Sequence, residues 1–364
     1  MSVHSVSMEV EKKLEITPYR TMQGHTQAVR GVVHLPDGRQ IITCSNDASL
    51  RLWDRESGAQ VGSNWQDDGD QEPVITIALS PNGKIVASGS RDGTVKVWDI
   101  ERREVTAKWT GHTDTVWSVC WSADGMCVAS GSRDGTVRVW EMESGETVLG
   151  PIKTGNWEVL AVAYSPDSSN IVSGGDKAIE IWDTTTGERL STLEQDSQVW
   201  SLTWTSDQKT VIAGFRNGSI GIFNTTTWEQ IAILEGHADY VNAISLLQND
   251  RLLASASHDE TARLWNLDTN LPVGPPLQHQ RVVWDAALSA DGKFLVTACL
   301  DKNVYVWDTH TILQEACLED LLSLPNVSVH LAPPALSDTP QTASMQLLSA
   351  LCNRPLIHTH RLPM

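Results

Sequence analysis

Short runs in which apolar and polar residues alternate recur along most of the chain. Val95 and Val97 alternate with Thr94 and Lys96, and the same spacing returns at residues 136–139. Strict alternation puts the apolar side chains on one face of a strand, and Gly, Asn and Asp clusters separate such runs at intervals of about eight to twelve residues. The pattern predicts an all-β fold built from many short strands.

The same dipeptide, or a close variant of it, ends seven of these strands. The seven positions are Trp53-Asp54, Trp98-Asp99, Trp140-Glu141, Trp182-Asp183, Phe223-Asn224, Trp265-Asn266 and Trp307-Asp308. Successive positions differ by 45, 42, 42, 41, 42 and 42 residues. This period is typical of four-stranded propeller blades, which bury their apolar faces by stacking on one another. Although 364 residues is long enough for two domains, the seven repeats predict a single one.

A histidine and an aspartate occupy fixed places before the closing tryptophan. The His precedes the Asp by 22 residues and the Trp by 28 in four repeats, which are His25/Asp47/Trp53, His112/Asp134/Trp140, His237/Asp259/Trp265 and His279/Asp301/Trp307. In period, spacing and residue type, the chain resembles the WD-repeat family from residue 16 to residue 308. The resemblance implies a seven-bladed β-propeller of four-stranded antiparallel blades.

The resemblance also implies how the ring closes. In this family each repeat supplies the outer strand of one blade and three inner strands of the next, so the last blade needs a strand from elsewhere. Residues 16–22 stand where an outer strand belongs, just before Gly24 and His25. We expect them to complete the blade of residues 280–308, which removes the open sheet edges.

The two ends of the chain fall outside the repeats. Residues 1–15 are expected to be a disordered leader. Residues 309–364 are expected to be a C-terminal tail with a short amphipathic helix within 312–322, and mostly disordered, because six prolines follow residue 322. Removal of residues 312–364 is therefore expected to leave the ring stable.

Four repeats carry a complete set of His, hydroxyl residue, Asp and Trp. The sets are His25, Thr43, Asp47, Trp53; His112, Ser130, Asp134, Trp140; His237, Ser255, Asp259, Trp265; and His279, Thr297, Asp301, Trp307. They resemble a nucleophile, a base and an orienting acid, but an active site needs one special constellation beside a cleft. The resemblance instead implies a structural link in which Asp orients His, His meets the hydroxyl, and the hydroxyl accepts the buried indole N–H. We expect no catalytic residue among them.

Three repeats depart from this set. The second has Asp70 in place of the His, and the fourth has Gly155 there and a shortened turn at residues 174–176. The fifth replaces all four members, by Gln195, Ala213, Asn217 and Phe223. We expect the blades of the fourth and fifth repeats to open most easily, because their loops are not tied to the sheet.

Three positions per repeat are expected around the mouth of the central channel. The resemblance puts the loop with the His and the turn with the Asp on one face, the narrower or top face. Five residues after the His position lie Arg30, Ile75, Trp117, Leu160, Trp200, Asn242 and Trp284. Three after it lie Ala28, Pro73, Thr115, Glu158, Gln198, Tyr240 and Val282, and just before the turn Asp lie Asn46, Arg91, Arg133, Gly175, Arg216, His258 and Leu300.

Eight of these residues are the expected partner-binding set. They are Arg30, Arg91, Trp117, Arg133, Trp200, Arg216, Tyr240 and Trp284. Trp, Tyr and Arg are the residue types that dominate interface energetics. The alternative is that the tryptophans only pack the channel wall, as aromatic residues commonly do.

The net charge of −18 bears on the kind of partner. It disfavours direct binding of nucleic acid or anionic membranes and favours basic protein partners, although such a charge also serves solubility alone. The acidic run at residues 67–72 is expected close to Arg91, as a neutralising partner or as a docking point for a basic segment. Together these features suggest a ligand with both signs of charge and an apolar anchor, such as an extended peptide.

Cysteine use and the N-terminal sequence indicate the compartment. The six cysteines form no Cys-x-x-Cys pair and no regular framework, so the sequence predicts neither a metal site nor a disulfide scaffold, and no cofactor. Residues 1–15 lack the apolar core of a signal peptide, and no run of ~18 apolar residues occurs. We expect a cytoplasmic or nuclear protein that is not secreted.

These observations predict a non-enzymatic scaffold or adaptor that binds partner proteins or peptides, as a monomeric ring within a larger complex. One alternative is the substrate-recognition subunit of a ubiquitin ligase or of a chromatin complex, although Arg55 stands one place too early for the Trp-Asp-x-Arg phrase of one ligase group. The other is a propeller enzyme. No unique carboxylate pair or Gly-rich phosphate loop supports it, and His358 and His360 are too sparse for a metal site.

Overall fold

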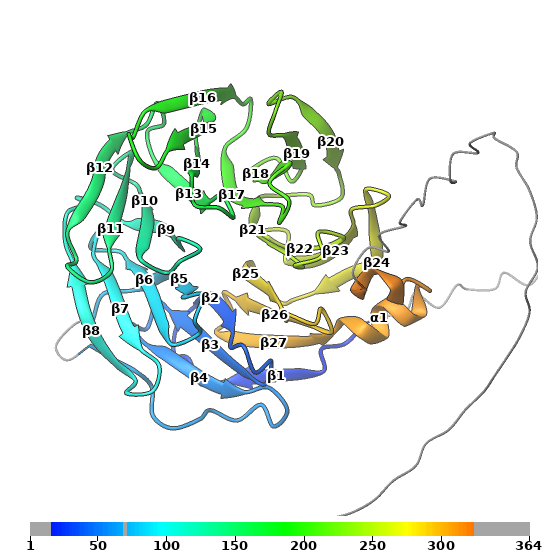
Figure 1. The fold of residues 1–364 in the computed structure, drawn as a ribbon. Coiled ribbons are helices and arrows are strands. Elements are labelled where there is room, and N and C mark those ends of the chain that lie inside the picture. Colours follow the sequence, from blue (N-terminus) through cyan, green and yellow to red (C-terminus); the bar gives the residue numbers. More distant parts are fainter. Residues whose placement is uncertain (1–15, 68–70, 324–364) are drawn as a thin grey trace, which may run out of the picture. The chain divides into compact units, whose positions relative to one another are not determined.

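A computed structural model describes residues 16–67 and 71–323 of the chain. In this part seven antiparallel sheets follow one another around a ring, and the first strand of each lies nearest the centre (Figure 1). The predicted all-β, seven-bladed propeller is confirmed. Each sheet is called a blade below and is numbered in chain order.

The strands of each blade run outward in sequence order. Blade 1 consists of β2 (Val29–His34), β3 (Gln40–Ser45) and β4 (Leu50–Asp54). Blade 2 consists of β5 (Val74–Leu79), β6 (Ile85–Ser90), β7 (Val95–Asp99) and β8 (Glu104–Trp109). Blade 3 consists of β9 (Val116–Trp121), β10 (Cys127–Ser132), β11 (Thr136–Glu141) and β12 (Thr147–Lys153). Blade 4 consists of β13 (Val159–Tyr164), β14 (Asn170–Gly175), β15 (Ala178–Asp183) and β16 (Arg189–Glu194).

The remaining blades follow the same order. Blade 5 consists of β17 (Val199–Trp204), β18 (Thr210–Phe215), β19 (Ile220–Asn224) and β20 (Gln230–Leu234). Blade 6 consists of β21 (Val241–Leu246), β22 (Leu252–Ser257), β23 (Thr261–Asn266) and β24 (Leu271–Gln278). Blade 7 consists of β25 (Val283–Leu288), β26 (Phe294–Cys299), β27 (Asn303–Asp308) and, as its outer strand, β1 (Arg20–Gln23).

The apolar core lies between neighbouring blades. One cluster joins Ala129 and Val137 of blade 3 to Val159 and Trp182 of blade 4, and comparable clusters join the other pairs around the ring. The contact is close at Gly131 in β10, where a Cβ atom would come within 2.6 Å of a Val159 methyl group. Because each blade buries its face on the next one, the blades depend on one another for stability.

The outer edge of blade 1 is irregular. Its fourth position is held by residues 60–65, which contact β4 through two isolated bridges, Leu50 with Trp65 and Trp53 with Gln60. The backbone of Trp65 exchanges both hydrogen bonds with Leu50, and its side chain is buried. This irregular edge lies between Trp53 and Trp98, which are 45 residues apart, the longest interval between repeats. Because of the extra residues, the repeat period does not predict the register of this outer segment.

The ring closes through the N-terminal strand. β1 pairs antiparallel with β27, with Met22 opposite Val304, and Met22 is buried in the cluster between blades 7 and 1. The closing strand begins at Arg20 and ends at Gln23, later than the expected 16–22. The reason is Pro18, which lacks a backbone N–H and so does not join the ladder.

The segment after β27 is structured as far as it is described. The helix expected within 312–322 begins at Thr309 and ends at Glu315 (α1, Thr309–Glu315), and a 3-10 turn follows at Glu319–Leu322 (η1). The side chains of Ile312, Leu313 and Leu321 are buried against blades 6 and 7. This burial argues against the expectation that residues 312–364 can be removed without loss of stability, which stays a prediction. The expected leader 1–15 and residues 324–364 lie outside the described residues.

Strand β1 generates the first prediction. Met22→Ala is expected to lower the free energy of unfolding by about 2–5 kcal/mol, because it removes a buried side chain from the closing seam. The control is Thr21→Ala, which changes an exposed residue of the same strand and should cost less than ~0.5 kcal/mol. Urea unfolding of both variants measures the difference, and equal small losses would contradict the closure.

Helix α1 generates the second prediction. Leu313 is fully buried and Gln314 beside it is exposed. Leu313→Ala should therefore cost about 2–5 kcal/mol of unfolding free energy, whereas Gln314→Ala should leave it within ~0.5 kcal/mol. Chemical denaturation of the full chain is the measurement. A Leu313→Ala variant as stable as the control would mean that the helix contributes nothing to the ring.

Candidate functional site

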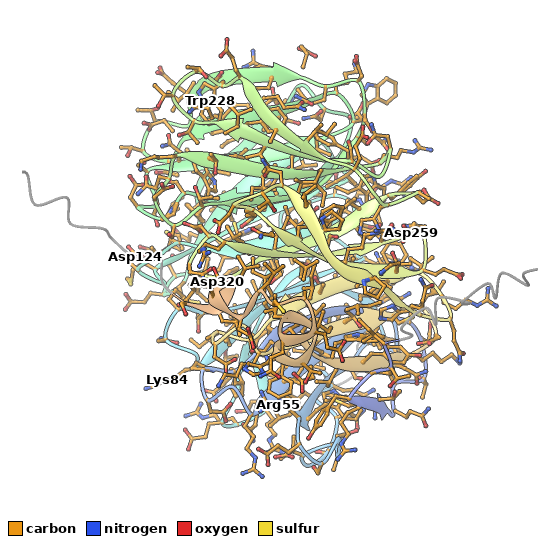
Figure 2. All side chains as sticks on the ribbon, turned by 90° about the vertical axis from the view of Figure 1, so that its right-hand side faces the viewer. Arg55, Lys84, Asp124, Trp228, Asp259 and Asp320 are labelled. Carbon is orange, nitrogen blue, oxygen red and sulfur yellow. The ribbon has the colours of Figure 1, made fainter. Side chains whose placement is uncertain are left out.

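The turns of the blades lie on two opposite faces of the ring. In the side view of Figure 2, Asp259 lies at one edge of the molecule and Asp124 at the other. Asp259 is in the turn between β22 and β23, and Asp124 is in the turn between β9 and β10. The face of Asp259 is called the top face below, and the face of Asp124, which Lys84 shares, is called the bottom face.

In blade 3 a chain of hydrogen bonds runs from the top-face turn into the sheet. His112 Nδ1 lies 3.0 Å from Asp134 Oδ2, and His112 Nε2 lies 2.8 Å from Ser130 Oγ. Trp140 donates its indole N–H to the same Ser130 Oγ at 2.8 Å. The same contacts occur in blade 1 with His25, Thr43, Asp47 and Trp53, and in blade 6 with His237, Ser255, Asp259 and Trp265. These connections are called the polar link below.

The hydrogen-bond pattern determines the protonation of the polar link. Ser130 Oγ accepts the indole proton, so its own proton points to His112 Nε2, and Nδ1 donates to Asp134. Burial lowers the pKa of His112 despite the opposing effect of Asp134, so the ring is neutral at pH 7. Burial also acts to raise the pKa of Asp134, but hydrogen bonds from Thr136 and Thr113 outweigh it and lower that pKa. The link is a hydrogen-bond relay from a neutral imidazole to a carboxylate.

The geometry of the polar link argues against a catalytic role for its hydroxyl groups. Thr43, Ser130 and Ser255 are fully buried, and each hydroxyl already contacts an imidazole and an indole. A nucleophile must reach a substrate, and these hydroxyls do not reach the surface. In these blades the group satisfies a buried indole N–H and ties a loop to its sheet.

Blade 7 departs from the expected set at Asp301. His279 Nε2 lies 2.7 Å from Thr297 Oγ1, and Trp307 donates to the same hydroxyl at 3.1 Å. The other ring nitrogen of His279 donates to the carbonyl of Leu277, not to Asp301. The assignment of Asp301 to the relay is therefore wrong.

Tyr305 is the reason that Asp301 does not bind His279. Two positions before the closing Trp, blades 1, 3 and 6 carry an arginine, and Arg138 in blade 3 donates to the Gly111 carbonyl at 2.9 Å. Blade 7 has Tyr305 at this place, and its hydroxyl donates to Asp301 at 2.5 Å. The ring of Tyr305 also stacks edge-on against His279, at 5.0 Å between centroids. Burial lowers the pKa of His279 to about 4, so this imidazole too is neutral at pH 7.

Blade 2 lacks the histidine and contains a buried ion pair. Trp98 keeps a hydroxyl partner, Ser88 at 2.8 Å. Beside it the buried Lys96 lies 3.3 Å from Asp67. The described start of the acidic run is thus paired with a lysine of its own blade and not with the arginine expected. Residues 68–70, which include the substituted His position, lie outside the described residues.

Blade 4 ties its loop to the sheet with different groups. Asn156 Oδ1 accepts the backbone N–H groups of Lys177 and Ala178 at 2.8 and 3.0 Å. Glu180 is buried, accepts the Gly155 N–H at 3.1 Å and pairs with Arg189 at 2.8 Å. Blade 4 was expected to open easily because its loop would not be tied to the sheet. That reason is wrong, since Asn156 and Glu180 tie the loop to the sheet.

Blade 5 dispenses with the polar link. Phe223 replaces the indole, so no buried N–H needs a partner, and its ring packs edge-on against Phe215 at 6.3 Å. Asn217 binds Ser219 within its own turn, and Ser197 Oγ accepts the Asn217 backbone N–H. The easier opening expected of this blade stays a prediction.

The residue five places after each His position lines one central cavity. The seven residues in its lining are Arg30, Ile75, Trp117, Leu160, Trp200, Asn242 and Trp284. Each is the second residue of an innermost strand, and each falls where the register to the next strand shifts by one residue. Such a β-bulge leaves its extra residue unpaired and re-aims the side chain. The bulges therefore explain why seven side chains point into one space of about 320 Å³.

The other two expected positions meet in pairs at the mouth of this cavity. The residue just before the turn Asp donates its backbone N–H to the residue three places after the His position. These pairs are Asn46 with Ala28, Arg91 with Pro73, Arg133 with Thr115, Arg216 with Gln198, His258 with Tyr240, and Leu300 with Val282. The side chains of Arg91, Arg133 and Arg216 are exposed. The structure thus places all eight expected partner-binding residues in or around one channel mouth.

Arg30 is held between aromatic rings. Its guanidinium carbon lies 3.7 Å from the ring centroid of Trp284 and 5.9 Å from that of Trp117. Burial lowers the pKa of Arg30 to about 10, and the charge of Arg91 acts in the same direction, so the side chain stays charged at pH 7. Cation–π contact stabilises a desolvated guanidinium in this position.

The aromatic side chains continue around the mouth as a connected series. Ring centroids are separated by 5.4 Å from Trp200 to Tyr240, 4.9 Å from Tyr240 to His258, and 5.0 Å from His258 to Trp284. The guanidinium of Arg216 lies 4.8 Å above Tyr240. Of the two roles expected for the tryptophans, wall packing accounts for part of their surface, since all three are half-buried.

One aromatic residue of the top-face loops, Trp157, was not among the positions expected at the mouth. Trp157 is 77% exposed, and Lys177 lies 5.8 Å from its ring centroid. Its backbone N–H donates to Asp176 of the adjacent turn at 2.5 Å. Trp157 stands two residues after Gly155, which holds the His position of this repeat. The mouth positions were expected three and five residues after the His position, so Trp157 was not considered.

Metal sites, membrane-spanning helices and disulfides were sought among the described residues. Among residues 16–67 and 71–323, no group of three His, Cys, Asp or Glu side chains is arranged to hold a metal ion. No helix in this part of the chain has the length and apolar character needed to cross a membrane. The cysteines that the structure describes are all free thiols.

Two family models match the chain. The model described as "IFT122 first beta-propeller" matches residues 73–308, and the model described as "WD domain, G-beta repeat" matches residues 16–54. Together they cover the propeller from the closing strand to the end of β27, except residues 55–72. The chain shares with both families the repeat on which the fold depends.

Curated proteins with similar sequences carry the same repeat. "Cell division cycle 20.1, cofactor of APC complex" of Arabidopsis thaliana is 29% identical over 244 residues, which is 64% of this chain and 52% of that protein. "Periodic tryptophan protein 2 homolog" of Dictyostelium discoideum is 29% identical over 204 residues, 43% of this chain and 22% of that protein. "Anaphase-promoting complex subunit cdh1" of the same organism is 28% identical over 115 residues, 30% and 15% respectively. The chain thus matches about half of the first relative and less of the others.

The polar link generates the third prediction. His112→Ala is expected to lower the free energy of unfolding by about 1–3 kcal/mol, because it removes one hydrogen-bond partner each from Asp134 and from the buried Ser130 hydroxyl, whose proton then has no acceptor. Gln195→Ala at the equivalent place of blade 5, where no relay exists, should change it by less than ~0.5 kcal/mol. Urea unfolding measures both. Equal costs would show that the relay adds nothing to stability.

Proposed function

Because the chain belongs to the WD-repeat β-propeller family, we propose that it is a non-enzymatic scaffold that binds partner proteins or peptides at the top face. The site is the channel mouth formed by Arg30, Arg91, Trp117, Arg133, Trp200, Arg216, Tyr240 and Trp284. The single observation that carries the proposal is the convergence of the bulged residues of seven blades on one cavity, with aromatic and arginine side chains around it.

The chemistry of this mouth favours binding over catalysis. Rigid aromatic rings and arginine forks supply contact area and charge at a small cost in conformational entropy, and these residue types carry most of the energy in protein interfaces. The hydroxyl groups that resemble nucleophiles belong to the polar link and are buried away from the mouth. A scaffold role also agrees with a ring whose blades offer loops around a narrow channel.

A second candidate is the substrate-recognition subunit of a ubiquitin ligase. Its support is in the names of the relatives, one of which is a cofactor of the APC complex and another an anaphase-promoting complex subunit. The match spans about half of the first of these relatives and 15% of the second, so the ligase role is carried by similarity to part of each. This candidate is a special case of the scaffold, in which the partners include a ligase complex and the proteins it modifies.

The channel mouth generates the fourth prediction. Trp117→Ala, Trp200→Ala or Arg133→Ala should weaken partner capture by roughly 1–4 kcal/mol each, because desolvated aromatic and arginine anchors dominate interface energetics. Affinity purification of the tagged chain from its own cells, with quantitative mass spectrometry, measures the capture. Thermal melting of each variant separates a lost contact from a lost fold.

The matched control is Lys84→Ala, which removes an exposed positive charge on the bottom face (Figure 2). It should leave capture intact, as should changes at Asp124 or Asp167 in bottom-face turns. Loss of capture in the bottom-face variants alone would overturn the assignment of the top face. The same eluates distinguish the two candidates, because subunits of an anaphase-promoting complex should be present only if the chain serves a ligase.

A further inference from the structure

The charge of the channel mouth is opposite to that of the chain. The chain carries a net charge of −18, yet Arg30, Arg91 and Arg133 line a single pocket at the mouth together with Trp117. Arg216 lies at the same mouth, above the ring of Tyr240. Among the described residues none of these four guanidinium groups has a carboxylate within ion-pair distance.

The wall of the cavity also contains buried donors that have no acceptor among the described residues. The indole N–H groups of Trp117, Trp200 and Trp284, and the Nε of Arg30, are buried and have no acceptor among the described residues. All four are donors only, and buried donors without an acceptor are rare in folded proteins. By contrast the wall residue Asn242 is satisfied, since it donates to the Val283 carbonyl at 2.8 Å.

Two carboxyl groups lie near these donors, and each accepts a backbone N–H. Asp114 lines the same pocket as Arg91 and Arg133, but its Oδ1 accepts the Thr115 N–H at 2.7 Å. Asp285 lines the cavity and accepts the Val32 N–H at 2.9 Å. Neither carboxyl lies within ion-pair distance of an arginine. The mouth therefore combines aromatic rings and unsatisfied donors with four guanidinium groups that have no ion-pair partner among the described residues.

We propose that the channel mouth binds an acidic side chain of a partner protein segment, with an apolar or aromatic neighbour on the rings of Trp117, Trp200 and Tyr240. A carboxylate suits this site because it accepts two parallel hydrogen bonds from a guanidinium, and such charge-assisted bonds are among the strongest in proteins. The inference rests on the proposed function, whose site it narrows to one ligand chemistry. It also replaces the basic partner expected from the net charge, since the local field at the site decides what binds there.

Nucleic acid fits the site less well, although phosphate is also an anion. A nucleic acid ligand needs a basic stripe along its backbone, whereas here the positive groups are confined to one mouth on a protein of strongly negative charge. A single-stranded oligonucleotide is therefore the comparison probe, and its binding is an outcome that counts against the proposal.

The test uses short synthetic peptide libraries and the full chain. Three libraries share the same randomised apolar and aromatic positions and differ only in one fixed position, which is Glu, Gln or Lys. Each is incubated with the immobilised protein, and the retained peptide is quantified. The Glu library should be retained at least about tenfold more than the Gln library, since a charge-assisted hydrogen bond is worth more than a factor of ten in affinity.

Two matched variants locate the effect. Arg91→Gln combined with Arg133→Gln removes two exposed charges at the mouth and should abolish the preference for Glu over Gln. Lys84→Gln alters an exposed lysine on the bottom face and should keep the full preference. Both variants change exposed side chains, and melting curves check that the ring remains folded.

Each other outcome counts against the inference in a defined way. Equal retention of the Glu and Gln libraries, a preference for Lys, or a Glu preference that survives the double Arg variant would overturn acidic recognition while leaving the proposed scaffold function. Oligonucleotide binding that the double variant removes would assign the mouth to nucleic acid. Retention of no library by the unmodified chain would overturn the proposed peptide site itself, and the inference with it.

Discussion

The antiparallel pairing of β1 with β27 is the interaction on which the rest of the ring depends. It joins residues that are far apart in sequence, and it covers the edge that blade 7 would otherwise expose. The inner end of the same seam is held by Asp285, which accepts the Val32 N–H of blade 1. Burial raises the pKa of Asp285 to about 7. Strand pairing outside and a buried carboxyl inside thus fasten the first blade to the last.

Once the ring is closed, individual blades tolerate different internal chemistry. The relay around Ser130 solves one physical problem, a buried indole N–H that needs an acceptor. Blade 2 keeps the hydroxyl and has a buried ion pair between Lys96 and Asp67, and blade 4 uses Glu180 and Asn156. Blade 5 needs no such acceptor, because the side chain of Phe223 has no N–H group. These solutions preserve the packing between blades, so the repeat can vary without a change of fold.

The bulge in each innermost strand links this architecture to the proposed function. An unpaired residue at the same place in seven blades produces a ring of side chains whose backbone positions are nearly invariant. Their identity is then free to differ, and in this chain it includes Arg30 and three tryptophans. Arg30 joins Arg91, Arg133 and Arg216 of the top-face turns, so a cluster of positive side chains forms at the mouth of an acidic protein.

The repeat period and the spacing of His, Asp and Trp followed from the sequence by itself, because each is a fixed offset within a local unit. Through the family resemblance that they carry, they also implied the strand order, the closing strand and the positions around the mouth. The exchange of Asp301 from His279 to Tyr305, the pairing of Asp67 with Lys96 and the burial of Leu313 were decided only by the tertiary structure. So were the unsatisfied donors of the cavity wall. These features depend on which side chains from different strands and blades compete for one space, and the period of a sequence carries no information about that competition.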